Sequence, residues 1–330
     1  MPDTLAPADT PTETGAPPAP DGIAPALWDQ LHALGADEQQ VLAEFIDRGA
    51  RDRCRLGPLD EISLVTNALK SRDDDDVSVM VKIEEKVGPS VRLTYPDAPR
   101  VPLETDLLDA DAGFADVLLA RRSRRGYAGT PLSLQELSTL LVLGYGAGIP
   151  TRAYNRPDVP LRAVPSAGGL QCVELYVVVN SVEGLEPGIY HYDAVGGALE
   201  LVERGSFRYR LTDVFYQAEW ITDASVVLMT APVLPRLSWK YNRRALRMVH
   251  IDSGIVTQTL HLAATSLKLR SCVVLGFDDE TADYFLGLDG RTQSTTLALA
   301  VGRHPWENGP DDRTSGGDGA TGEWSFGMTS

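Results

Sequence analysis

The chain has 330 residues, and its 30 Lys and Arg against 46 Asp and Glu give a formal net charge of −16. That charge argues against non-specific binding to nucleic acid or to an anionic membrane, because both need a surplus of Lys and Arg. Three cysteines without a C-x-x-C spacing argue against a disulfide framework or a cysteine zinc site. No apolar run approaches the ~18 residues of a membrane span, and the first Lys or Arg is Arg48, so no signal-peptide pattern is present. We expect a cytoplasmic protein.

Both ends of the chain are predicted to be tails. Residues 1–23 contain six prolines and few bulky apolar side chains, so they cannot offset the entropy of ordering and should be disordered. Residues 307–330 have a similar composition apart from Trp324 and Phe326. These two side chains could pack back onto the body, but a flexible tail is the favoured interpretation.

Residues 24–100 are predicted to form a small winged-helix-like module. Three segments with helical apolar spacing are followed by two with alternating apolar residues: 24–35, 37–49, 59–72, 77–83 and 91–95. The third helix carries one Lys and one Arg against two acidic residues, so it should not read DNA. Docking of a peptide or protein and a purely structural cap on the larger domain are the two interpretations left.

Residues 101–306 are predicted to form an α+β domain. Ser133 and Glu136 have the spacing of a capping box, which starts a helix that should stop at Gly144. Apolar runs predict strands at 172–180, 188–193, 198–203, 224–232, 271–275 and 295–302. A long, mostly apolar helix over about 242–267 indicates burial on every side, as at a domain centre or a dimer interface.

Common nucleotide and metal motifs do not account for the function. Gly144–Gly148 resembles part of a dinucleotide fingerprint, but it follows a helix instead of a strand and opens no helix of its own. The five histidines show no ligand spacing, so no metal site is expected. Cys172 and Cys272 fall in predicted strands and are interpreted as buried apolar residues instead of redox groups.

A cluster of cations at residues 121–125 is a candidate phosphate site. Guanidinium groups bind phosphate oxygens in pairs and the hydroxyl of Ser123 adds a donor, although such a cluster alone is more often a solvated helix end. Arg303, after the last strand, offers another cation. In the Gly-rich segment 165–171, small residues would let backbone amides approach a flat ring, and residues 274–276 could present N–H groups to the same ring.

The order of these segments resembles a known family. R-R-S-x-R, P-S-A-G-G, K-Y-x-x-R-A-x-R and a strand that ends at G-F follow one another as in the FMN-dependent nitroreductase superfamily. More narrowly the chain is similar to the SagB-type dehydrogenases, which oxidise thiazolines and oxazolines to azoles in ribosomally made peptides. The resemblance covers about 110–305. It implies a nitroreductase-like α+β fold with a mixed or antiparallel central sheet flanked by helices.

The resemblance also implies a cofactor, partners and binding residues. Members are homodimers with FMN between protomers, which would account for the apolar helix over 242–267; an azoline-containing precursor peptide is the implied substrate, and a cyclodehydratase is a candidate partner. The implied FMN-binding residues are Arg121, Arg122, Ser123 and Arg125 with help from Arg303 at the phosphate and ribityl chain, Pro165, Ser166, Ala167 and Gly168 beside the flavin, and the backbone of Leu275 and Gly276 near the N5 edge.

Lys240 and Tyr241 are the predicted catalytic pair, because azoline-oxidising members carry a Lys-Tyr pair here that is implicated as the base. Aromatisation removes a proton from Cα and a hydride from Cβ, so one side-chain base suffices while flavin N5 takes the hydride. A lysine serves as a base only when neutral. We expect burial and the nearby Arg243, Arg244 and Arg247 to favour that form. The sequence does not separate Lys240 as base with Tyr241 as relay from the reverse.

Two positions depart from the family pattern. Ile255 and Thr259 replace polar residues that relatives tend to carry on the long helix, so a role at those positions is in doubt.

Two rival functions remain. One rival function is an NAD(P)H-dependent reductase of nitro or quinone compounds. The other is a binding protein whose 24–100 module recruits a leader peptide or partner while the flavin fold is vestigial. The retained Arg and Lys-Tyr motifs disfavour the latter.

Overall fold

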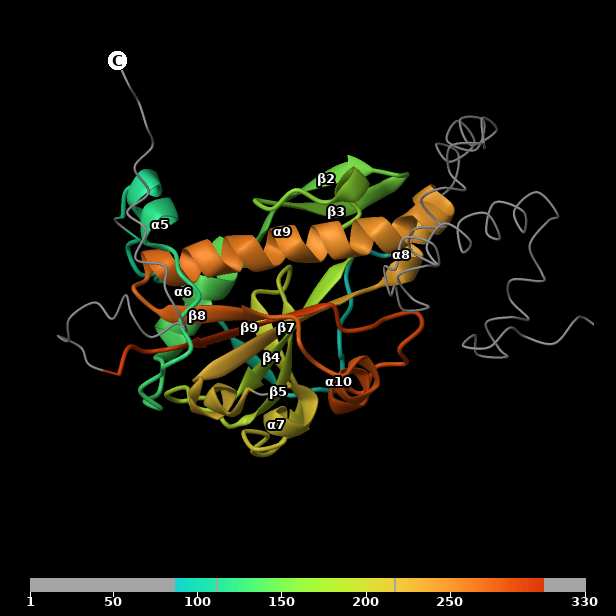
Figure 1. Ribbon diagram of the computed structural model, residues 1–330. Helices are drawn as coiled ribbons and strands as arrows, with labels where there is room; N and C mark the ends of the chain where they lie inside the picture. Colours follow the sequence, from blue (N-terminus) through green and yellow to red (C-terminus); the bar gives the residue numbers. More distant parts are fainter. Residues whose placement is uncertain (1–86, 111, 217, 306–330) are drawn as a thin grey trace, which may run out of the picture. The chain divides into compact units, whose positions relative to one another are not determined.

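The computed structural model describes residues 87–110, 112–216 and 218–305 (Figure 1). The chain divides into two compact units between Asp76 and Val77, and all of these residues belong to the second. The predicted tails, the helices of the 24–100 module and its first strand lie outside them.

A seven-stranded antiparallel sheet forms the centre, with the strand order β1-β6-β5-β4-β7-β9-β8. The strands are β1 (Arg100–Pro102), β4 (Val173–Val179), β5 (Gly188–Asp193), β6 (Ala198–Arg204), β7 (Val226–Pro232), β8 (Arg270–Val274) and β9 (Leu297–Gly302). Every residue of β4 and β7 is buried. Such strands need cover on both faces. The predicted α+β fold class is confirmed. The prediction allowed a mixed or an antiparallel central sheet, and the observed sheet is antiparallel.

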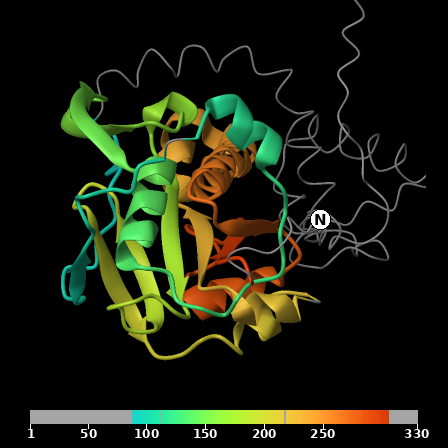
Figure 2. The ribbon, with the colours of Figure 1, turned by 90° about the vertical axis from the view of Figure 1, so that its left-hand side faces the viewer.

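Helices cover both faces, and the alternation of side chains along the strands divides the core in two. Leu175 and Val177 of β4 pack with α6 (Leu134–Tyr145) and α9 (Ala245–Ser266). Tyr176 and Val178 pack on the opposite face with α7 (Leu211–Val214) and α10 (Asp279–Leu286). Figure 2, which looks along α9, shows α6 and α9 on one side of the sheet and α10 on the other. The remaining helical segments are α5 (Phe114–Ala120), η2 (Ala167–Gly169), η3 (Glu219–Asp223), α8 (Leu234–Tyr241) and η4 (Asn242–Arg244).

Helix α6 begins as the sequence predicts. The Ser133 hydroxyl accepts from the Glu136 N–H, and the Glu136 carboxylate accepts from the Ser133 N–H at 2.7 Å. The helix runs one residue past the predicted stop at Gly144. A Cβ on Gly144 would lie 2.3 Å from Cδ2 of Leu260, so glycine there permits the close approach of α6 to α9.

Helix α9 is formed, but it is not buried on every side within one chain. Leu246 is 44% exposed and Ile251 is 52% exposed, whereas the polar Asp252, Ser253 and Thr257 are buried. The prediction used the total apolar content of the segment, which does not separate the two faces of a helix. Among the helices that the structure describes, none is long and apolar enough to cross a membrane.

Two local predictions differ from the structure. Strands β2 (Ala147–Ala153) and β3 (Arg156–Arg162) form a separate hairpin that the sequence did not reveal, because its prolines mask the alternation of a strand pair. Conversely, residues 91–95 do not form the second strand of the predicted module hairpin. They are instead fixed by polar contacts, for example the Arg92 guanidinium with Asp193 at 2.6 Å.

Candidate functional site

Lys240 and Tyr241 are the last two residues of α8. The helix stops there because Asn242 has a φ of 47°, a backbone state that Asn adopts more readily than most residues. The chain then turns through η4 into α9. The predicted catalytic pair therefore sits at the elbow between two helices, at the N-terminal end of α9 (Figure 1).

Three segments far apart in the sequence meet at this elbow. Lys240 Nζ donates a 2.9 Å hydrogen bond to the Tyr154 hydroxyl in the β2–β3 turn, and lies 4.8 Å from the centre of the Tyr154 ring. It also lies 5.3 Å from the centre of the Tyr241 ring. The Tyr154 hydroxyl in turn donates to the carbonyl of Gly168. We call Tyr154, Gly168, Lys240 and Tyr241 the elbow cluster.

Gly168 shows how closely the polar atoms of the elbow cluster converge. A Cβ added to it would lie 2.5 Å from the Tyr241 hydroxyl, 2.9 Å from the Tyr154 hydroxyl and 3.4 Å from Lys240 Nζ. Its φ of 62° also disfavours any side chain. The predicted flavin loop and the predicted catalytic pair are therefore one site. Gly168 itself is exposed, so a ligand can approach the cluster from solvent.

A buried carboxylate holds the loop in place. Asp252 of α9 is 4% exposed and accepts from the Ser166 hydroxyl at 2.8 Å and from the Ala167 N–H at 3.0 Å. The Ser166 hydroxyl also accepts from the Gln171 N–H. Ser166 and the Ala167 N–H therefore order the loop by facing Asp252, whereas Pro165 and Gly168 are exposed.

A second set of charges anchors α8 one turn before the elbow. The Arg236 guanidinium is buried and pairs with Glu174 of β4 at 2.5 Å. It also donates to the carbonyls of Gln171 and Ser90, both at 2.9 Å. The contact with Gln171 ties α8 to the end of the same Gly-rich segment.

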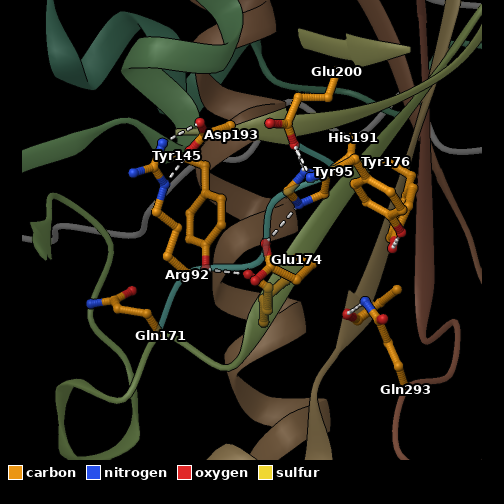
Figure 3. Close-up of polar contacts among 12 residues, drawn as sticks. Arg92, Tyr95, Tyr145, Gln171, Glu174, Tyr176, His191, Asp193, Glu200 and Gln293 are labelled. Atoms are coloured by element: carbon orange, nitrogen blue, oxygen red, sulfur yellow. Dashed lines mark hydrogen bonds and ion pairs between the residues drawn. The ribbon is translucent and has the colours of Figure 1, made fainter. Parts of the chain in front are cut away.

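The carboxylate of Glu174 continues into a buried chain across the sheet (Figure 3). His191 Nε2 lies 3.0 Å from Glu174 and His191 Nδ1 lies 2.9 Å from Glu200, which also pairs with Arg100. Burial opposes the charge of Glu174, but Arg236 and His191 outweigh it and lower the pKa of Glu174. Burial likewise opposes the charge of His191, but the two carboxylates raise its pKa. We call Arg236, Glu174, His191 and Glu200 the buried charge chain.

The charge state of Lys240 differs from the prediction. Partial burial lowers the pKa of Lys240, but its hydrogen bonds and charge interactions with Tyr154 and Tyr241 outweigh burial and raise the pKa above its usual value. The expectation of a neutral lysine, based on burial and on Arg243, Arg244 and Arg247, is therefore wrong for this arrangement. These contacts favour the ammonium form of Lys240, which lies between two phenols.

The cationic segment lies at the other end of α9. Ser123 pairs with Ser271 at the start of β8, and the Arg124 N–H donates to the Ser271 carbonyl at 2.9 Å. His261, near the C-terminal end of α9, lies 3.3 Å from the Arg122 carbonyl. His261 is nine residues beyond Asp252, which corresponds to roughly 13 Å along the helix.

The arginines of this segment have different surroundings. Arg122 donates to the carbonyls of Leu119 and Arg121. The Arg125 guanidinium lies 5.9 Å from the Trp220 ring. Burial raises the pKa of the Cys272 thiol, while Arg125 and the Ser123 hydroxyl beside it act in the opposite direction. Ser123 and Arg125 are therefore at the start of β8, as a shared phosphate site would need.

Strand β8 runs from the cationic segment back beneath α9 (Figure 1) and ends at Val274, and Leu275 and Gly276 follow it. Leu275 is 69% exposed, and a Cβ on Gly276 would meet no atom within 4 Å. The cationic segment therefore lies near the start of β8, and the open backbone follows the end of that strand. Arg303 is differently engaged: its guanidinium pairs with Glu136 at 2.7 Å and donates to the Pro131 carbonyl.

Sequence reasoning missed Tyr154, Asp252 and Arg236. A single acidic residue inside a long apolar helix could have marked Asp252, because buried carboxylates need partners. Tyr154 and Arg236 have no comparable local signal. Within the described ranges, no group of three or more His, Cys, Asp or Glu side chains could hold a metal ion.

Comparison with known proteins identifies the class. The nitroreductase family matches residues 118–303, which is more than half of the chain. The fold and the match together show that the chain belongs to the nitroreductase family.

Three curated proteins are similar in sequence. MJ1384 of Methanocaldococcus jannaschii, which is named as a nitroreductase, is 32% identical over 217 residues, covering 66% of this chain and 98% of that protein. The trifolitoxin-processing protein TfxB of Rhizobium leguminosarum is 26% identical, covering 52% of this chain and 48% of that protein. The microcin B17-processing protein McbC of Escherichia coli is 25% identical, covering 52% of this chain and 62% of that protein.

A solved structure supports the fold. A crystal structure of an Anabaena variabilis protein, also named as a nitroreductase, aligns with a TM-score of 0.54 and 25% identity. The match covers 66% of this chain and 45% of the other. The chain thus spans nearly all of MJ1384 but about half of TfxB and of the Anabaena protein.

Proposed function

We propose that this chain is a SagB-type, FMN-dependent dehydrogenase that oxidises thiazoline or oxazoline rings of a ribosomally made peptide to azoles. The observation that carries the proposal is the convergence of Lys240, Tyr241 and Gly168 at one exposed site. The two relatives that process trifolitoxin and microcin B17 support a role in peptide maturation. A cytoplasmic location and a cyclodehydratase partner belong to the same proposal.

The residues present fit FMN. FMN pairs a phosphate with a flat ring. The chain offers the Ser123 hydroxyl and the Arg125 guanidinium beside the start of β8, and open backbone at Gly276 just beyond its end. Arg121 and Arg122 would complete the phosphate end, while Arg303 would contribute only by leaving Glu136. Bound FMN would supply the hydride acceptor. The loop from Pro165 to Gly168, held by Asp252, would pack beside it.

The chain's own residues would then handle the proton. The azoline Cα–H is acidified by the adjacent C=N and carbonyl, so a positioned side-chain base is enough to remove it. Lys240 and Tyr241 lie together at the elbow, with Lys240 Nζ 5.3 Å from the centre of the Tyr241 ring, so both side chains are placed to take part in removing it. The exposed position of Gly168 leaves a route for the proton to solvent.

A homodimer is part of the proposal. Helices α5 and α9 expose apolar side chains that an isolated soluble domain would normally cover: Phe114, Leu118, Leu119, Leu246 and Ile251. We propose that a second copy of the chain covers them.

A reductase of nitro or quinone compounds that uses NAD(P)H is the second candidate. It is favoured by the match to MJ1384, which this chain covers almost completely. Rapid consumption of NADPH with such acceptors, without oxidation of azoline peptides, would select it.

The test uses the purified protein with FMN and an azoline-containing peptide, and mass spectrometry follows the loss of one hydride and one proton per ring. We expect loss by the wild type and strongly reduced loss by Lys240→Ala and Tyr241→Phe. Tyr284→Phe, on an exposed side chain of α10, is the matched control and should behave as wild type. Wild-type rates in both elbow variants would refute the assignment of the pair.

A further inference from the structure

The backbone at Tyr154 is unusual for an aromatic residue. Tyr154 and Asn155 form the β2–β3 turn with φ values of 52° and 56°. A hairpin turn of this kind favours Asn or Gly at both positions, and a left-handed conformation costs other residues about 1–2 kcal/mol. Such a conformation persists when the surroundings hold the residue, and it often marks a functional position.

Contacts from three other segments hold Tyr154. Its carbonyl accepts from the Gly88 N–H at 2.9 Å. Its ring packs edge-on against Trp239 of α8, with centroids 5.5 Å apart at 84°. Its hydroxyl donates to Gly168 in the flavin loop. The tip of the hairpin is thus joined to both parts of the proposed active site.

The direction of the hydrogen bonds assigns a role to the hydroxyl. It gives its proton to the Gly168 carbonyl and accepts one from Lys240 Nζ. An ammonium group has three N–H donors and no acceptor, and the Tyr154 oxygen accepts one of these hydrogens. Among the described residues, Tyr241 is a second titratable group that faces Lys240, and Asp252 lies behind the loop with its oxygens on Ser166 and Ala167.

We propose that Tyr154 is a positioning residue of this active site, whose phenol holds the Lys240 ammonium group against the loop of Gly168 and beside Tyr241. The inference rests on the proposed function and deepens it, because it divides the roles of the catalytic pair. Lys240 acts by its charge, and the oxygen of Tyr241 is the proton acceptor. The substrate Cα–H bond would break as an O–H bond forms on Tyr241, the Cα–Cβ double bond of the azole would form, and bound FMN would be the oxidant that takes the hydride from Cβ.

The test measures the ionisation of Lys240 directly, without substrate. Purified protein is treated with an amine-acetylating reagent over a range of pH, and mass spectrometry of the Lys240 peptide gives the midpoint of its reactivity. The midpoint is the readout because it does not depend on how exposed the amine is. We expect Tyr154→Phe to lower it by about one pH unit, which means roughly tenfold more free amine at a given pH below the midpoint.

Two further variants keep the test decisive. Tyr154→His retains a hydrogen-bond acceptor near Nζ and should restore most of the wild-type midpoint, and it serves also if Tyr154→Phe does not fold. Tyr284→Phe should leave the midpoint unchanged. A Tyr154→Phe midpoint equal to that of the wild type overturns the inference.

The two proposals fail in different ways. If the wild type oxidises no azoline peptide, the proposed function fails, and the Lys240 midpoint still tests the contact with Tyr154. If the wild type is active and Tyr154→Phe changes neither the midpoint nor the pH profile of azoline oxidation, only the role of Tyr154 fails.

Discussion

The elbow cluster and the buried charge chain each include a residue of the short helix α8, Lys240 and Arg236, which lie one helical turn apart. The two clusters nevertheless have different roles. Arg236 is 4% exposed, and its partner Glu174 is 3% exposed. Lys240 is only partly buried and contacts phenols instead of carboxylates. A guanidinium fully matched by a carboxylate fixes a helix, whereas an ammonium group beside weakly acidic, accessible groups can take part in proton transfer.

The largest effect on stability should come from the buried charge chain. Arg236→Met leaves Glu174 buried without its main partner, so we expect a loss of about 3–5 kcal/mol in the free energy of unfolding. Arg204→Met, which removes an exposed pair with Glu186, is the matched control and should cost less than about 1 kcal/mol. Chemical denaturation measures both. Equal losses would show that burial does not distinguish the two pairs.

The largest effect on activity at little cost in stability should come from Gly168→Ala. The added Cβ would collide with the Tyr241 hydroxyl, and misplacement of catalytic groups can cost on the order of 100-fold in rate. Gly169→Ala is the control, because its φ is also positive but its Cβ would meet nothing within 4 Å. Both variants should lose stability from the positive φ, and Gly168→Ala somewhat more because of the collision, but only Gly168→Ala should lose azoline oxidation. Equal activities of the two variants would contradict the proposed contact between the Gly168 loop and the Lys240–Tyr241 pair.

The stability that the buried charge chain contributes should depend on pH. The raised pKa of His191 means that its stabilisation is fully present below its unfolded value of about 6.5 and is lost as the pH rises through the folded value. The lowered pKa of Glu174 means that its stabilisation is present above about 4.3 and is lost as the pH falls through its folded value. The buried charge chain should therefore stabilise most between these limits.

His191→Gln should remove the decline in stability on the alkaline side, as measured by urea midpoints at several pH values. His250→Gln, on an exposed side chain of α9, should leave the decline unchanged. If the decline persists in His191→Gln, then groups other than His191 cause it.

The smallest effect should come from Ser166→Ala. It removes the hydrogen bond of the Ser166 hydroxyl to Asp252 and the one that this hydroxyl accepts from the Gln171 N–H, while the Ala167 N–H still binds Asp252. A loss of about 1–2 kcal/mol in unfolding free energy is expected. Thermal melting with the wild type as reference measures it. No loss would mean that the Ala167 N–H alone holds the segment to α9.

Regular patterns in the sequence were sufficient to locate most of the helices and strands of the domain, while the fold itself was implied by the family resemblance. The capping box of α6 and the apolar runs of β4 to β9 depend on neighbours in the chain, so the sequence reveals them directly. Helix α9 was predicted in position, but which face it exposes depends on what packs against it. The β2–β3 hairpin was missed because its prolines hide the strand pattern.

The motifs of the candidate site were visible in the sequence, but their arrangement in space was not. Lys240 and Tyr241 could be selected from the resemblance to the azoline-oxidising family, whereas the contact of Lys240 with Tyr154 joins residues 86 positions apart. The charge state of Lys240 follows from that contact and not from the neighbouring arginines. Ser166 was expected beside a flavin, but its hydroxyl is directed to a carboxylate in another helix.

The central claim is that the elbow cluster takes a proton from an azoline while the flavin takes the hydride. The most direct measurement is flavin absorbance after the FMN-loaded protein is mixed, without oxygen or NADPH, with an azoline peptide carrying hydrogen or deuterium at Cα. We predict that the flavin bleaches, more slowly with deuterium, and that Tyr241→Phe suppresses bleaching. Bleaching by NADPH alone, with no response to the azoline peptide, would contradict the account.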